Sequence, residues 1–266
     1  MRKINLNIRP LVWVLMLMLA GPVSARIIYV DPNGSADFTS IQDGIDDAND
    51  YDEIEVAPGT YNEAIDFNGK AVRLYSSSEP EVTTIDANGI AGAYHVVQCV
   101  SGEDANTILE GFTITGGDAI GPSFPDDCGG GMFNDNSSPT VTNCTFTGNT
   151  ADDNGGGMEN YQSSPTVTNC NFTNNSAYWD GGGMYNWDNS NPTVTNCTFS
   201  SNLATGIGGG MENYPSSSPS LTNCAFSGNS AGTYGGGMDN WYKCNPTVTN
   251  CTFSGNSADA GNGMMN

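Results

Sequence analysis

The sequence predicts an all-β fold, a parallel β-helix (solenoid) of about eight coils with 26–27 residues in each. The main observation is a repeat that includes six methionines at this spacing: Met132, Met158, Met184, Met211, Met238 and Met264. A second observation is that the apolar runs within each repeat are short, rich in Thr and Val, and separated by Gly, Asn and Ser, which is typical of strands. Three short strands and three turns fill one repeat, so each repeat predicts one coil, stacked about 4.8 Å from the next.

A cysteine motif follows the same period, Pro-[Thr/Ser]-[Val/Leu]-Thr-Asn-Cys-x-Phe-x-x-Asn, with cysteines at Cys144, Cys170, Cys197, Cys224 and Cys251. We expect Val141, Cys144 and Phe146, with their counterparts, to point inward and form ladders. Stacked coils place neighbouring Cβ atoms about 4.8 Å apart, whereas a disulfide needs about 3.8 Å. The sequence therefore predicts a buried ladder of free thiols. Three cysteines lie outside the ladder, Cys99, Cys128 and Cys244, and a Cys99–Cys128 disulfide stays open.

Asparagine and glycine are the expected turn residues of each coil. We expect Asn134, Asn143 and Asn149, with their counterparts, to mark turns at which stacked amides pair along the axis. A Gly triplet precedes most of the repeated methionines. Because glycine adopts positive φ without steric cost, we expect the triplet to form a tight turn beside the inward methionine.

Residues 1–25 predict a cleaved signal peptide. Met1 to Lys3 supplies a basic start, Leu11 to Gly21 is an uncharged apolar run, and small residues precede Arg26. The apolar run is shorter than the roughly 20 residues that span a bilayer, and no comparable run follows. We therefore expect an exported protein with no membrane-spanning segment in the mature chain, at an extracellular location or on the cell outer membrane surface.

The mature chain divides into two regions of one continuous domain. Residues 26–117 predict an N-terminal cap and irregular first coils, with a short capping helix after Ser40, where Ile41, Ile45 and Ala48 share one face. Residues 118–266 predict the regular repeats, which end in the middle of a coil. An open last coil exposes strand edges, so end-to-end self-association is expected.

Two resemblances add to this interpretation. Residues 30–34, 37–42 and 54–63 resemble the opening segment of right-handed parallel β-helix proteins of the pectate lyase and pectin methylesterase type. The repeats from Gly129 onward resemble the chlamydial-type polymorphic outer-membrane protein repeat, which is marked by a Gly-Gly-aliphatic step and Phe-x-x-Asn. Here the second mark is present five times, beginning with Phe146 to Asn149, while the first is Gly-Gly-Gly-Met. The first resemblance implies a right-handed β-helix. The second implies a surface protein used in adhesion or recognition, and it implies no catalytic residue.

Charge excludes several classes of partner. The chain has 29 acidic and seven basic residues, so binding to nucleic acid or to an anionic membrane surface through a basic patch is not expected. Ca²⁺ takes carboxylate oxygens as ligands, so calcium binding has to be considered for a surface with so many acidic residues. We interpret Asp126-Asp127 and Asp152-Asp153 as solvated turn acids, and we predict no metal site and no cofactor.

Acidic and aromatic residues that alternate with the inward Met and Asn predict an exposed stripe across successive coils. Its members are Glu159, Tyr161, Tyr185, Trp187, Glu212, Tyr214, Asp239 and Trp241. Aromatic rings stack on sugars and carboxylates accept hydrogen bonds from hydroxyls, so this stripe indicates binding of a polysaccharide or a cell-surface glycan. Ordinary stacking of side chains on a strand surface would give the same pattern.

Two functions remain open from the sequence. The first is a non-catalytic recognition or adhesion protein. The alternative is a polysaccharide-active enzyme, either a hydrolase or a lyase, because Glu212 and Asp239 on adjacent coils have a separation compatible with paired catalytic carboxylates. No catalytic residue is assigned, because any ladder of outward acids produces that separation, the motifs of polygalacturonases are missing, and the few basic residues of the mature chain form no lyase motif.

Overall fold

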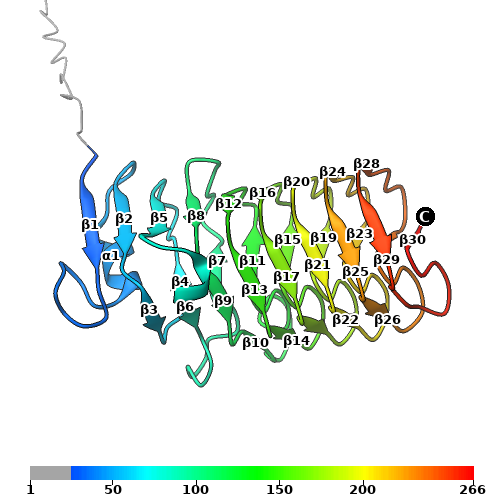
Figure 1. The fold of residues 1–266 in the computed structure, drawn as a ribbon, viewed down its shortest axis with the longest axis horizontal. Helices are drawn as coiled ribbons and strands as arrows, with labels where there is room; N and C mark the ends of the chain where they lie inside the picture. Colours follow the sequence, from blue (N-terminus) through cyan, green and yellow to red (C-terminus); the bar gives the residue numbers. More distant parts are fainter. Residues whose placement is uncertain (1–24) are drawn as a thin grey trace, which may run out of the picture.

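The computed structural model describes residues 25–266, which form a right-handed parallel β-helix of about nine coils (Figure 1). The fold class is as predicted, with one coil more than expected. The signal-peptide prediction lies outside the described residues except for Ala25. One short helix, α1 (Ile41–Asp47), and one 3-10 turn, η1 (Pro80–Val82), accompany the strands.

Four parallel sheets run along the axis. Five coils contribute to them in the order 1, 2, 3, 4, and the coils at either end have no strand in sheet 3. Sheet 1 consists of β1 (Ile27–Val30), β2 (Glu53–Val56), β5 (Arg73–Ser76), β8 (Ile108–Glu110), β12 (Thr140–Thr142), β16 (Thr166–Thr168), β20 (Thr193–Thr195), β24 (Ser220–Thr222) and β28 (Thr247–Thr249). Sheet 2 consists of β3 (Gly59–Tyr61), β6 (Thr83–Asp86), β9 (Thr113–Thr115), β13 (Thr145–Thr147), β17 (Asn171–Thr173), β21 (Thr198–Ser200), β25 (Ala225–Ser227) and β29 (Thr252–Ser254).

The remaining strands form the other side of the helix. Sheet 3 is short and consists of β10 (Asp118–Ala119), β14 (Thr150–Ala151), β18 (Ser176–Ala177), β22 (Leu203–Ala204) and β26 (Ser230–Ala231). Sheet 4 consists of β4 (Ile65–Asp66), β7 (Val97–Cys99), β11 (Met132–Asp135), β15 (Met158–Tyr161), β19 (Met184–Trp187), β23 (Met211–Tyr214), β27 (Met238–Asn240) and β30 (Met264–Met265). Pairing places equivalent repeat positions side by side, as when Met158 pairs with Met132 and Met184.

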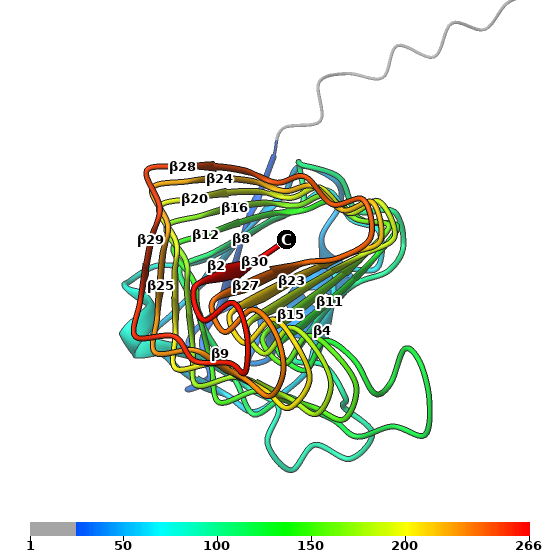
Figure 2. The ribbon, with the colours of Figure 1, turned by 90° about the vertical axis from the view of Figure 1, so that its right-hand side faces the viewer.

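The core lies between sheets 1, 2 and 4, as the view along the axis shows (Figure 2). Val141, Cys144 and Phe146 are fully buried, as predicted, and the phenylalanines of successive coils stack with ring centroids 4.6–4.8 Å apart. The cysteines of the ladder are free thiols that donate to backbone carbonyls, for example Cys144 to Thr142. Cys99 and Cys128 are also free, so the disulfide that the sequence left open does not form between them.

Two asparagine ladders differ from one another in place and exposure. Asn143 and its counterparts are exposed and have positive φ, which is the predicted turn role. Asn149 and its counterparts are buried next to a turn, and each Nδ2 donates to the Oδ1 of the next asparagine. The turn predicted at Asn134 was wrong, since this residue lies within β11 and is buried, two residues from Met132 on the same face of the strand. The amide pairing predicted for it is confirmed, because its Nδ2 donates to the Oδ1 of Asn160 at 2.9 Å.

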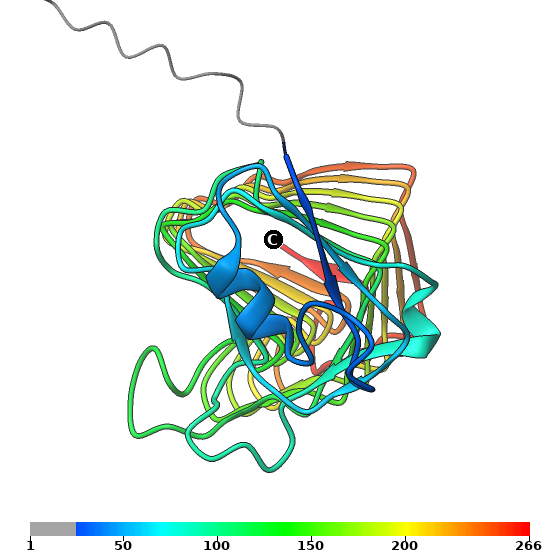
Figure 3. The ribbon, with the colours of Figure 1, turned by 90° about the vertical axis from the view of Figure 1, so that its left-hand side faces the viewer.

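The N-terminal end is closed by α1, which lies across it (Figure 3). Ser40 accepts a hydrogen bond from the Asp43 amide, and Ile41 and Ile45 are buried, so the predicted capping helix is confirmed. Longer coils follow, such as the one between Leu74 and Leu109. Their loops project beyond the outline of the regular coils (Figure 2).

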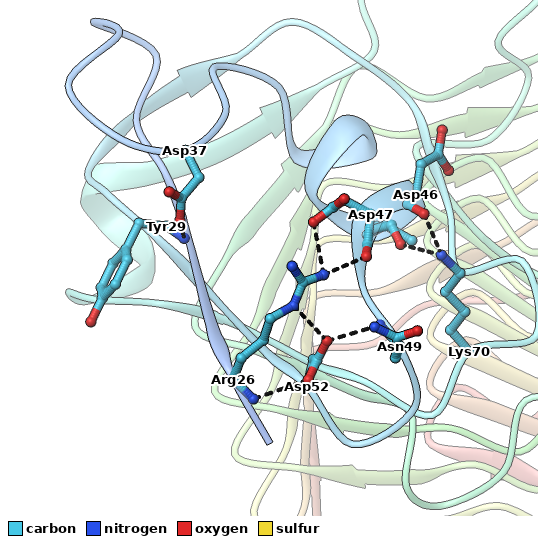
Figure 4. A network of polar contacts seen from close by, with 9 residues as sticks. Arg26, Tyr29, Asp37, Asp46, Asp47, Asn49, Asp52 and Lys70 are labelled. Carbon is cyan, nitrogen blue, oxygen red and sulfur yellow. Dashed lines mark hydrogen bonds and ion pairs between the residues drawn. The ribbon is translucent and has the colours of Figure 1, made fainter. Parts of the chain in front are cut away.

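A polar network fixes this cap (Figure 4). Asp52 is buried and accepts hydrogen bonds from the Arg26 amide and side chain and from the Asn49 amide, at 2.9–3.0 Å. Burial raises the pKa of Asp52, but these hydrogen bonds outweigh burial and hold the pKa below its ordinary value. Lys70 donates to the carbonyls of Ile45 and Asp46 at the end of α1.

Candidate functional site

The structure brings the predicted stripe together on the outer face of sheet 4, in two rows. In the inner row, Glu159 pairs with Tyr185, Tyr185 with Glu212, and Glu212 with Asp239. The outer row consists of Tyr161, Trp187, Tyr214 and Trp241. Register along the axis is therefore as predicted.

Exposure of the inner row was predicted wrongly. Glu159 is 0% exposed, Glu212 1% and Asp239 4%. The cause is the segment between sheets 3 and 4, which curls back under the outer face of sheet 4 in each coil (Figure 2). Its first triplet glycine sits directly on the row: a Cβ on Gly208, which has φ +66°, would lie 2.6 Å from the Cβ of Glu212.

The outer row is half-buried at one end and open at the other. Tyr161 and Trp187 stack with centroids 4.7 Å apart, and Phe124, from the long loop of an irregular coil, packs edge-on against both. Tyr214 and Trp241 lie 5.5 Å apart at the other end, where Trp241 is 60% exposed. The open part of the stripe is thus its C-terminal half.

A groove of about 680 Å³ lies beside this open half. Trp179, Tyr234 and Trp241 supply exposed aromatic surface, and Asp180 and Asp239 supply carboxyl groups. The sequence prediction missed Trp179, Asp180 and Tyr234. These residues could have been found from the sequence, because they directly precede the Gly triplets and so belong to the segment that covers sheet 4.

The acidic groups of the groove hold their protons more tightly than usual. Burial raises the pKa of Asp180 to about 6, against a lowering hydrogen bond from the Ile207 amide. Burial, and then the charge of Asp180, raises the pKa of Asp239 to about 6. Burial also raises the pKa of Glu212 well above its ordinary value. Near pH 6 Asp180 and Asp239 therefore change between hydrogen-bond donors and acceptors beside the aromatic rings, and above that pH they are mainly acceptors.

A second cluster lies on the same side, on the two coils that directly precede Asp180. Asp127, Cys128 and Asp153 place their ligand atoms within 4.8 Å of one another, and such groups can hold a metal ion. Asp127 and Asp153 are half-buried, so they differ from the solvated turn acids that the sequence predicted.

Residues 71–265 match the family model described as a right handed beta helix region. The chain belongs to this right-handed β-helix family. A comparison with curated proteins finds no match. No helix within residues 25–266 has the length and apolar character needed to cross a membrane.

Solved structures share the β-helix fold at low sequence identity. YbhC from Escherichia coli is 11% identical and aligns over 98% of this chain and 78% of its own, with a TM-score of 0.53. A pectin methylesterase from carrot is 13% identical over 92% of this chain and 89% of its own, with a TM-score of 0.49. A pectin methylesterase from Aspergillus niger is 14% identical over 91% and 89%, with a TM-score of 0.48. At this identity the likeness to YbhC shows the fold alone.

Proposed function

We propose that this β-helix is an exported surface or secreted recognition protein that binds a polysaccharide or cell-surface glycan without cleaving it. The observation that carries the proposal is the groove in which Trp179, Tyr234 and Trp241 flank Asp180 and Asp239. Exposed aromatic rings stack on the apolar faces of sugars, and carboxyl groups bind their hydroxyls. The resemblance of the repeats to polymorphic outer-membrane protein repeats supports the same role.

Glycan-array binding tests the proposal with the mature chain. We expect a Trp179→Ala, Trp241→Ala double variant to bind its glycan at least about tenfold more weakly, because the two rings provide the stacking surface. The matched control is Tyr51→Asn, which removes an exposed aromatic at the other end of the helix and suits the positive φ found there. Equal loss in both variants, or no glycan bound by the wild type, would contradict the proposal.

The alternative is a polysaccharide-active enzyme that uses the same groove. The raised pKa values of Asp239 and Glu212 favour it, because a protonated carboxyl is what a general acid requires. Release of oligosaccharides from a bound polysaccharide, abolished in Asp239→Asn or Glu212→Gln, would establish the alternative. Binding without any product supports recognition.

Export and location belong to the same proposal. The expected processing after Ala25 is tested by N-terminal sequencing of the protein recovered from the medium or the envelope, where Arg26 should be the first residue. Protein confined to the cytoplasm with Met1 retained would contradict export. End-to-end association remains a prediction, to be tested by light scattering of the mature chain.

A further inference from the structure

Three segments from two consecutive coils converge near the start of the regular repeats: the end of the loop before β11, the covering segment of the next coil, and β15. Asp127 and Cys128 end the long loop that precedes β11, and Asp153 lies in the covering segment of the next coil. The Sγ of Cys128 lies 3.4 Å from Oδ1 of Asp127 and 4.0 Å from Oδ2 of Asp153. A backbone hydrogen bond of 2.8 Å from the Asp153 amide to the Asp127 carbonyl fixes the two acids relative to one another.

Glu159 on β15 is fully buried beside the same cluster. Neither of its carboxylate oxygens has a hydrogen-bond partner among the described residues. Burial raises its pKa, and the other groups that shift this pKa are the Cys128 thiol, Asp153 and Asp127. The thiol is therefore a close neighbour of Glu159, although it does not reach either oxygen in hydrogen-bonding geometry. A buried carboxyl without a partner is costly, so a ligand that satisfies it would stabilise the fold.

We propose that Asp127, Cys128, Asp153 and Glu159 bind a divalent cation of the zinc type. Zn²⁺ takes four ligands from Cys, Asp and Glu, with bonds of about 2.3 Å to sulfur and about 2.0 Å to oxygen. A tetrahedral arrangement of such bonds separates sulfur from oxygen by roughly 3.5 Å. The separation of Cys128 from Asp127 already fits, and that from Asp153 exceeds it by about half an ångström. This rests on no part of the glycan proposal.

The thiol selects the class of cation. Ca²⁺ and Mg²⁺ take oxygen ligands, whereas thiolate favours zinc and similar soft metals. Metal binding displaces the Sγ proton of Cys128 to solvent as the metal–sulfur bond forms, and a protonated Glu159 loses its proton to solvent in the same way. His95 stacks on Phe133, and its Nδ1 lies 3.1 Å from the Gly129 carbonyl; it is not included in the site. The site consists of the four named side chains.

The chain contains its own control. β15 and β23 have the identical sequence Met-Glu-Asn-Tyr, and Glu212 is buried like Glu159, with one oxygen lacking a partner among the described residues. No thiol is among the groups that shift the pKa of Glu212, which are Asp180 and Asp239. Glu212→Gln thus removes an equivalent buried acid without touching the proposed site.

Titration of the chelator-treated mature chain with Zn²⁺, and with Co²⁺ as an absorbing probe, tests the site. We expect one ion per chain, a thiolate-to-Co²⁺ charge-transfer band, release of protons from the ligands, and a rise of Tm with Zn²⁺. Cys128→Ser should abolish the band, and Glu159→Gln should weaken Zn²⁺ binding at least about tenfold. Glu212→Gln and Cys244→Ser should bind as the wild type does.

Several results would overturn the proposal. They are a wild-type chain that binds no Zn²⁺ at micromolar concentration, equal affinity for Ca²⁺, and unchanged binding in Glu159→Gln and Cys128→Ser. Circular dichroism of each variant establishes that it is folded before its affinity is compared. If Glu159→Gln fails to fold, Asp127→Asn on the half-buried edge of the site provides the same comparison.

Discussion

Single residues determine whether the outer face of sheet 4 can be covered. Gly208 has positive φ and lies on Glu212, where a Cβ would also meet the Met211 carbonyl at 2.7 Å. We expect Gly208→Ala to lower the free energy of unfolding by more than about 2 kcal/mol, because it combines backbone strain with a clash. Chemical denaturation measures this loss.

Gly89→Ala separates the two causes. Gly89 has φ +76°, and a Cβ there would meet nothing within 4 Å. Only the strain of a positive φ then applies, and we expect the free energy of unfolding to fall by about 1 kcal/mol. Equal losses at the two positions would mean that close packing of the glycine on Glu212 contributes nothing.

The buried acids predict an unusual pH dependence. Asp180 and Asp239 have pKa values of about 6 in the folded chain, against about 3.9 for an unfolded Asp. Between these values the folded state binds more protons than the unfolded state, so stability falls as pH rises from about 4 to 6. Asp52 acts in the opposite sense, since its lowered pKa stabilises the fold above about pH 4 and this contribution is lost on acidification.

Thermal unfolding from pH 3 to 8 checks this pH dependence. We expect Tm to be highest in the acidic range and to fall toward neutral pH, and we expect the fall to be smaller in Asp239→Asn. A Tm that rises steadily from pH 4 to 7 would contradict the burial of these carboxyl groups.

At the scale of elements, stacked asparagines join one coil to the next. Asn202 accepts hydrogen bonds from the amide and Nδ2 of Asn175, and its own Nδ2 donates to the Phe172 carbonyl. Asn202→Ala leaves these groups buried and unpaired, so we expect a loss of about 2–4 kcal/mol in unfolding free energy. Asn196→Ala in the exposed ladder should cost about 1 kcal/mol, mainly from its positive φ, because its side-chain hydrogen bonds to Asn169 and Asn223 are exposed to water. Similar losses of unfolding free energy in the two variants would mean that burial of the Asn202 ladder adds nothing to its stabilising effect.

The sequence predicted those elements whose environment repeats with the period. Cys144 and Phe146 are inward in every coil, because strand alternation within one coil fixes their direction. Burial of Glu159 could not be predicted in this way, since its cover comes from the segment before the Gly triplet, which alternation on β15 does not describe. Asn134 was misassigned because asparagine is typical of turns, whereas here it belongs to a polar ladder inside a strand. The sequence drew attention to Asp127 and Asp153, but it did not join Cys128 to them, because Cys128 lies outside the repeat.

At the scale of the whole molecule, the coils behave as stacked units. Met158 and Met184 occupy the same position on adjacent coils, so deletion of residues 158–183 joins equivalent points and preserves the register. We expect this deletion variant to retain β-sheet circular dichroism and cooperative unfolding, with lower stability. Deletion of half that length reverses which side chains face inward and should prevent folding. Aggregation of the whole-coil variant would mean that the coils are not interchangeable.

The contact between Arg26 and Asp52 has a consequence for the timing of folding. In the precursor, Arg26 presents a neutral backbone amide to Asp52, 3.0 Å away. The cleavage proposed after Ala25 would convert that amide into an α-amino group, which carries a positive charge at neutral pH because its pKa is near 8. A charge-assisted hydrogen bond then replaces a neutral donor at a buried carboxylate. If the chain is cleaved there as proposed, the N-terminal cap of the cleaved form is tighter, and the uncleaved chain is the less stable form.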